Sequence, residues 1–168
     1  MPIHSFAPIA SPASEVLILG SMPGKASLRA GQYYAHPQNA FWKIIGELLE
    51  FEQDAAYQTR LDCLLQNRIS MWDVLKTCTR ASSLDADIVD SSSVANDFAT
   101  FFAEHCKIST VLFNGAKAES SFHKLVLPTL STSLQLDLHR LPSTSPANAS
   151  TSFQRKLELW GALLSERC

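Results

Sequence analysis

The residues with the clearest chemical potential follow the first apolar run of the chain. The glycine- and proline-containing segment 20–24 comes directly after that run, and Tyr33, Tyr34 and Asn39 come shortly afterwards. Two glycines with Pro23 between them can turn a backbone tightly and point N–H groups at a carbonyl oxygen or an anion. Tyrosine rings stack on flat rings such as nucleobases, and an asparagine amide both donates and accepts hydrogen bonds. This set predicts a site built from backbone groups, amides and aromatic faces.

The commonest catalytic motifs are missing from the sequence. It contains neither a G-x-x-x-x-G-K-[ST] nor a G-x-G-x-x-G loop, and no G-x-S-x-G nucleophile elbow. Its four cysteines, Cys63, Cys78, Cys106 and Cys168, are not spaced as zinc or iron–sulfur ligands. We therefore expect free thiols and no metal site.

Length and composition predict one globular domain over residues 1–168. The chain is 46% apolar and 18% charged, and it is long enough to bury a core without disulfides. The start of the chain lacks the basic region and apolar core of a signal peptide, and no run of 18 apolar residues occurs. We expect a monomer that is neither secreted nor membrane-bound, cytoplasmic and nucleoid-associated in a prokaryote or nuclear in a eukaryote.

Charge is distributed unevenly, although the net charge is only −2. Segments 20–46 and 105–157 are basic, whereas segment 47–104 between them is acidic. The two basic segments also contain the unusual motifs. This pattern is compatible with a nucleic-acid partner, although a random mixture of solvated charges explains it equally well.

Apolar runs alternate with amphipathic stretches along the chain. The runs 15–20 and 108–115, which end in glycine, and the run 134–141 predict buried parallel strands, and a shorter strand is expected at 69–75. Helices are expected at 39–51, 54–68, 93–105, 116–126 and 153–166, and a polar loop at 77–88. This order predicts a three-layer α/β/α sandwich around a short, mainly parallel four-stranded sheet.

Ligands bind to such sheets beyond the carboxyl ends of the strands. The segments GSMPG (20–24), FNG (113–115) and LPSTSPAN (141–148) all follow or end predicted strands. We therefore expect these three segments to meet in one cleft.

Taken together, these segments resemble the uracil-DNA glycosylase superfamily. AHPQNAFW (35–42) is similar to the mismatch-specific uracil/thymine-DNA glycosylases. The chain is most similar to the hypoxanthine-DNA glycosylase branch in the combination of GSMPG, SMWDVL (70–75), R-x-S-S-L-D-x-x-I (80–88) and LPSTSPAN. The resemblance runs from about Val16 to the final helix. It implies a monofunctional DNA N-glycosylase that needs no metal or cofactor. Such an enzyme flips hypoxanthine, or also uracil or xanthine, out of DNA. Hydrolysis of the N-glycosidic bond would leave an abasic site for base excision repair.

The resemblance also implies roles for particular residues. Met22 stands where the mismatch-specific relatives carry a polar catalytic residue, so Asn39 is the catalytic candidate, holding water; Tyr34 would stack on the flipped base. The implied base pocket consists of Gly20, Ser21, Met22, Pro23, Gly24, Tyr34, His36 and Asn114. The implied DNA-binding residues are Lys25, Ser143, Thr144, Ser145, Pro146, Ala147 and Asn148, most of them in the loop expected to enter the minor groove.

Structural roles stay open for several of these residues. Asn39 could only cap the following helix, Asn114 could only shape a turn, and His36 could only hold the backbone. Asp73 and Asp85 are expected to be structural although they border the cleft. Two other functions also stay open. One is a non-catalytic nucleic-acid-binding module of the same fold, which the lack of a strong base favours, and the other is a nucleoside N-glycoside hydrolase.

Overall fold

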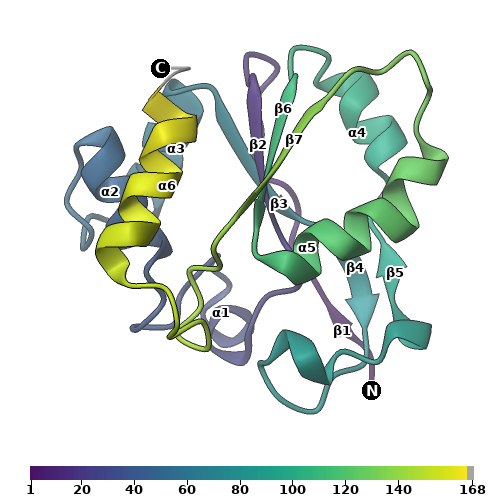
Figure 1. Cartoon of the computed structure of the whole chain (residues 1–168), viewed down its shortest axis with the longest axis horizontal. Coiled ribbons are helices and arrows are strands. Elements are labelled where there is room, and N and C mark those ends of the chain that lie inside the picture. The colour runs from purple at the N-terminus through teal and green to yellow at the C-terminus, as the bar shows by residue number, and fades with distance from the viewer. Residues whose placement is uncertain (166–168) are drawn as a thin grey trace.

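A parallel sheet forms the centre of the computed structural model, which describes residues 1–165 (Figure 1). Its strands are β2 (Val16–Gly20), β3 (Ile69–Asp73), β6 (Thr110–Asn114) and β7 (Asp137–Leu141). All neighbours are parallel, in the order β3-β2-β6-β7. Every residue of β2, β3 and β6 is buried, as continuous apolar runs predict for strands covered on both faces. The predicted four-stranded parallel sheet is confirmed.

Helices cover both faces of this sheet (Figure 1). One face carries α2 (Phe41–Leu49), α3 (Tyr57–Gln66) and α6 (Phe153–Ser165). The other face carries α4 (Phe98–Glu104) and α5 (Ala116–Ser121), which continues into a π-helical turn (Phe122–Val126) and a 3-10 turn (Leu127–Thr129). The three-layer arrangement agrees with the sequence prediction.

Side chains of β2 divide between the two layers because successive strand residues point to opposite faces. Leu17 and Leu19 belong to the hydrophobic cluster under α4 and α5. Val16 and Ile18 belong to the cluster under α2, α3 and α6. The two clusters therefore pack against opposite faces of the same strand.

A second, antiparallel sheet was not predicted. It contains β1 (Ile3–His4), β4 (Leu75–Cys78) and β5 (Val94–Ala95), in the order β1-β4-β5. The single strand expected at 69–75 is divided at Val74, whose N–H still donates to Gly20 O, and β4 begins at the next residue. Strands of two residues leave no periodic signal in a sequence.

Several predicted boundaries also move. The predicted loop 77–88 includes the end of β4 and the 3-10 turn η1 (Asp85–Asp87), which is followed by η2 (Asp90–Ser92). The helix expected from residue 93 begins at Phe98, because β5 occupies its first residues. The short helix α1 (Lys25–Ala30) was missed. The predicted end of the last helix at residue 166 lies outside the described residues.

No helix in residues 1–165 is long and apolar enough to cross a membrane. Cys63, Cys78 and Cys106 are free thiols, and Cys168 lies outside the described residues. Within the same range, no group of three or more His, Cys, Asp and Glu side chains could hold a metal ion.

Candidate functional site

The four parallel strands end side by side at one edge of the sheet. Gly20 is paired with Asp73 in the ladder between β2 and β3, and Asn114 is paired with Leu141 between β6 and β7. The loops that carry the predicted site residues leave from this carboxyl edge, where ligands bind in parallel α/β sheets. The structure therefore places the ends of the three predicted segments along one edge.

Gly20 is required by the close approach of two side chains. A Cβ atom at this position would lie 2.5 Å from Asp73 Oδ1 and 3.0 Å from the Tyr34 hydroxyl. Such contacts are too short for any larger residue. Gly24, by contrast, has an ordinary φ of −71°, and a Cβ atom there would meet only Ser83 at 3.7 Å. The expectation that the two glycines allow a tight turn is wrong, because Gly20 is the last residue of β2 and neither glycine has a positive φ.

Two polar atoms next to Gly20 lack hydrogen-bond partners within residues 1–165. Asp73 is 4% exposed, and its Oδ2 atom and the Tyr34 hydroxyl are buried without a hydrogen bond to any described residue. Burial raises the pKa of Asp73 to about 7, with a further increase from Asp85 and an opposing effect of Arg80. Burial and the charge of Asp73 raise the pKa of Tyr34, while the Asn114 side chain lowers it. The edge thus contains a carboxyl group that is partly neutral near pH 7.

The segment after β4 holds the loop after β2. The Ser21 hydroxyl donates to Asp85 Oδ1 at 2.5 Å, and Arg80 Nη2 donates to the Pro23 carbonyl at 2.6 Å. The Lys25 amine donates a hydrogen bond to the Ala81 carbonyl at 3.0 Å. Burial raises the pKa of Asp85, and the hydrogen bond from Ser21 opposes this shift. The predicted polar loop is therefore a second wall of the site.

Met22 is 6% exposed and belongs to the apolar core under α4 and α5. A thioether in this position has no group that could orient water. The backbone N–H groups of Ser21, Met22 and Gly24 donate no hydrogen bond to another described residue. This loop can therefore offer backbone donors, as predicted from the sequence, but no catalytic side chain at position 22.

Asn39 lies two residues before the start of α2 and is half-buried. Its Oδ1 atom accepts the Phe41 N–H at 3.0 Å, and its own N–H donates to the His36 carbonyl at 2.9 Å. The amide nitrogen Nδ2 forms no hydrogen bond with the described part of the chain. The side chain thus satisfies a backbone donor at the helix start and keeps its own donors for a ligand.

The two tyrosines have different environments. Tyr33 is buried, and its hydroxyl donates to the Ala7 carbonyl at 2.9 Å. Tyr34 adopts a left-handed backbone with φ 55°, and its ring stacks on Phe41 with a centroid distance of 3.9 Å. His36 is exposed, and its Nδ1 atom accepts the Gln38 N–H at 3.1 Å. Of these three rings, Tyr34 is the one in contact with the carboxyl edge.

Thr144 connects three predicted segments. Asn114 Nδ2 donates to Thr144 Oγ1, and the Thr144 N–H donates to Asn114 Oδ1, both at 2.9 Å. The Thr144 carbonyl accepts the N–H of Ala40, the residue after Asn39, at 3.0 Å. Thr144 is fully buried and Asn114 is 7% exposed. The Asn114 amide therefore fixes the 143–148 loop.

The rest of this loop lies nearer the surface. Pro146 and Ala147 are exposed, and Asn148 Nδ2 donates to the Ser143 carbonyl at 3.1 Å. The buried amine of Lys156 donates to the Asn148 carbonyl at 3.0 Å, and burial lowers its pKa. An open depression of about 480 Å³ is lined by Gly115, Ala116, Arg140, Leu141, Pro142, Ser143, Asn148 and Thr151.

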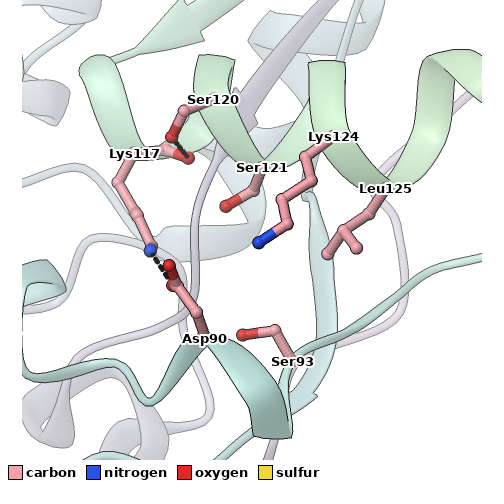
Figure 2. A pocket seen from close by; sticks show the side chains of 7 residues that line it. All are labelled: Asp90, Ser93, Lys117, Ser120, Ser121, Lys124 and Leu125. Carbon is pink, nitrogen blue, oxygen red and sulfur yellow. Dashed lines mark hydrogen bonds and ion pairs between the residues drawn. The ribbon is translucent and has the colours of Figure 1, made fainter.

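A smaller cavity of about 120 Å³ lies apart from these residues, between η2 and the helical segment after β6. Figure 2 shows Lys117 paired with Asp90 across its mouth, at 2.5 Å, with Ser93 and Lys124 nearby. None of the predicted site residues lines it.

The residues that sequence reasoning undervalued are Asp73, Arg80 and Asp85. The position of Asp73 in the sequence could have identified it, because it is a carboxylate at the end of a mostly apolar strand, where the site was expected. Arg80 is 8% exposed, and two of its nitrogens have no hydrogen-bond partner in the part of the chain that the structure describes, which nothing in the sequence indicates.

Comparison with known proteins identifies the family. A model of the Uracil DNA glycosylase superfamily matches residues 7–164, so the chain belongs to the uracil DNA glycosylase superfamily. This confirms the resemblance found in the sequence.

Two curated relatives are named hypoxanthine DNA glycosylase. The chain is 38% identical to the one from Methanosarcina acetivorans over 151 residues, which is 89% of this chain and 90% of the relative. It is 40% identical to the one from Methanosarcina barkeri over 116 residues, 68% of this chain and 72% of the relative. A solution NMR structure of a proposed uracil DNA glycosylase from M. acetivorans is 35% identical in sequence to this chain, and the two structures superpose with a TM-score of 0.81. The match covers 99% of this chain and 98% of the chain in the NMR structure.

Proposed function

We propose that this chain is a DNA glycosylase that removes deaminated bases, with hypoxanthine as the principal substrate. It hydrolyses the N-glycosidic bond and leaves an abasic site for base excision repair. The observation that carries the proposal is the similarity to relatives named hypoxanthine DNA glycosylase, which extends over 89% of this chain. The described geometry suits this activity, because the carboxyl edge offers an aromatic face, amide donors and backbone N–H groups together.

In this proposal, each segment has one task. Asn39 holds the attacking water through its unpaired amide nitrogen. Tyr34 stacks on the flipped base, and the backbone donors of the loop after β2 bind a base carbonyl oxygen. The 143–148 loop and Lys25 contact the DNA backbone. The protein acts as a monomer without a metal or other cofactor.

The test uses duplex oligonucleotides that contain one hypoxanthine, uracil or xanthine, followed by alkaline cleavage of abasic sites. Wild type is expected to release hypoxanthine, and Asn39→Ala is expected to lose nearly all release. Because Ala also removes the acceptor for the Phe41 N–H, Asn39→Ser serves as a matched variant. Serine is a good acceptor at a helix start and preserves stability, but it lacks the amide donors.

The two variants separate catalysis from helix capping. Loss of release in both, with Asn39→Ser as stable as wild type, supports a catalytic role. Full release by Asn39→Ser would contradict it. DNA binding without release by wild type would indicate a non-catalytic binding module, and release from free nucleosides alone would indicate a nucleoside hydrolase.

A further inference from the structure

We propose that Asp73 is a general acid that donates a proton to N7 of the departing purine. The inference rests on the proposed function, since it concerns how the same site releases hypoxanthine. Asn39 can orient water, but an amide has no proton to give to a leaving group. Asp73, at the carboxyl edge, has such a proton when its carboxyl group is neutral.

The position of Asp73 supports contact with a base. It ends β3 at the carboxyl edge, where its backbone is paired with Gly20. Its Oδ1 atom and the Tyr34 hydroxyl both lie within 3.0 Å of the point where a Gly20 Cβ atom would sit. A base that stacks on the Tyr34 ring would therefore lie beside this carboxyl group.

The missing hydrogen bonds indicate that a ligand completes this cluster. Asp73 Oδ2 and the Tyr34 hydroxyl are buried and unpartnered within residues 1–165. Buried polar side chains in folded proteins normally find partners, and exceptions occur at catalytic sites. A carboxylic acid can donate to a purine nitrogen, which satisfies Oδ2 when the substrate is bound.

Burial keeps the proton on Asp73 near neutral pH. It raises the pKa of this carboxyl group to about 7; Asp85 from η1 raises the pKa further, and Arg80 from the segment after β4 lowers it. Tyr33 and Tyr34, from the segment before α2, also face Asp73, but the pKa values of both phenols are raised, so both stay neutral. A neutral carboxylic acid in an apolar site is a suitable proton donor.

The step balances without any further reactant. The C1′–N9 bond breaks and its electron pair passes into the purine, while N7, in the same five-membered ring, takes the Asp73 proton. Hypoxanthine then leaves as a neutral molecule. Water held by Asn39 adds to C1′, and its proton returns to the Asp73 carboxylate through solvent.

The test measures single-turnover release of hypoxanthine by wild type and Asp73→Asn between pH 5 and pH 9. Wild type is expected to lose about tenfold in rate per pH unit above about pH 7, because the acid form is depleted. Asp73→Asn is expected to be at least about a hundredfold slower at pH 6 and to lack this decline. Asp85→Asn should shift the decline to lower pH, because a like charge is removed. Asp62→Asn, an exposed carboxyl change on α3, is the control and should behave as wild type.

A substrate change tests the same step without altering the protein fold. In 7-deazahypoxanthine a C–H group replaces N7 and cannot accept the proton. Wild type should release it at least about a hundredfold more slowly than hypoxanthine, and Asp73→Asn should add little further loss. Equal release of the two bases by wild type would overturn the inference. So would a folded Asp73→Asn enzyme with the wild-type rate and pH profile, although the proposed function would stand. No release of any deaminated base by wild type would overturn both.

Discussion

The carboxylate of Asp73 occupies the space that a side chain on Gly20 would need. Its Oδ1 atom lies 2.5 Å from the position of a Cβ atom on that glycine, and the sheet register pairs the two residues directly. Glycine is therefore a steric requirement at the end of β2. Because it has no side chain, the Asp73 carboxyl group and the Tyr34 hydroxyl can both approach the Gly20 backbone.

Gly20→Ala should displace Asp73 and Tyr34 together. We expect a loss of about 1–3 kcal/mol in the free energy of unfolding, because an extra methyl group is forced into a packed site. Base release should fall by about a hundredfold or more, since small displacements of positioned groups cost about that much. Urea denaturation and single-turnover release measure the two effects.

Gly161→Ala on α6 is the control for this change. Its Cβ atom would meet the flexible end of Leu48 at 3.1 Å, so the neighbour can move. Activity should match wild type. If Gly20→Ala were as stable and active as this control, the close approach at Gly20 would have no consequence in solution.

Thr144→Val should loosen the loop over the carboxyl edge. Valine matches threonine in shape but leaves Asn114 Nδ2 buried without its acceptor, which costs about 1–3 kcal/mol of stability. The backbone bond from the Thr144 N–H remains, so the fold should persist. Thermal unfolding and DNA-binding titrations check the result. Thr132→Val, an exposed change in the loop before β7, should leave both unchanged.

Substitutions of Tyr34 should separate its ring from its hydroxyl. Within residues 1–165 the hydroxyl has no hydrogen-bond partner, so Tyr34→Phe should keep stability within about 1 kcal/mol and release within a few-fold of wild type. Tyr34→Ala removes the stacking on Phe41 and on the base, and it should reduce release by an amount equivalent to about 1–3 kcal/mol. A strong defect in Tyr34→Phe would mean that the hydroxyl itself takes part in the reaction.

The buried carboxyl of Asp73 should destabilise the protein at alkaline pH. Its pKa is raised from 3.8 to about 7 on folding, so the folded state binds the proton more tightly than the unfolded state. The free energy of unfolding should therefore decrease as pH rises from about 4 to about 7, and then stay level. Asp73→Asn lacks this titration and should be more stable than wild type at pH 8, by up to about 4 kcal/mol.

Urea denaturation of wild type and Asp73→Asn at pH 4, pH 6 and pH 8 measures this difference. The two proteins should be closest in stability at pH 4. Asp62→Asn should follow wild type at all three values. The prediction would be contradicted if the difference in unfolding free energy between Asp73→Asn and wild type became smaller as the pH rises. That result would show that the folded protein stabilises the charged form of Asp73.

The strand ends were predictable from sequence because they depend on local pattern. The apolar runs that end at Gly20 and close to Asn114 identify buried strands, and parallel strands bring their carboxyl ends to one edge. The position of Asn39 just before a helix follows from the spacing of the apolar residues after it.

The role of Asp73 could not be predicted in the same way. Its burial depends on Gly20 and Tyr34, which are distant in sequence, and its pKa depends on Asp85 and Arg80. The contact between Arg80 and Pro23 joins residues 57 positions apart, and no periodicity encodes it. The double hydrogen bond of Asn114 with Thr144 was missed for the same reason, although both residues belonged to the predicted site.

The bonds between Asn114 and Thr144 also order events during synthesis of the chain. The residue that anchors the segment beside Asn39 is encoded about 100 residues later, in the last part of the polypeptide, and it must close a long loop before the site is complete. The central strands can pair earlier, but the hydrogen bonds that hold the 143–148 loop at the carboxyl edge cannot form until Thr144 has left the ribosome. A chain that is truncated before this residue would therefore lack the assembled site, so that release of bases from DNA begins only after the whole fold has closed.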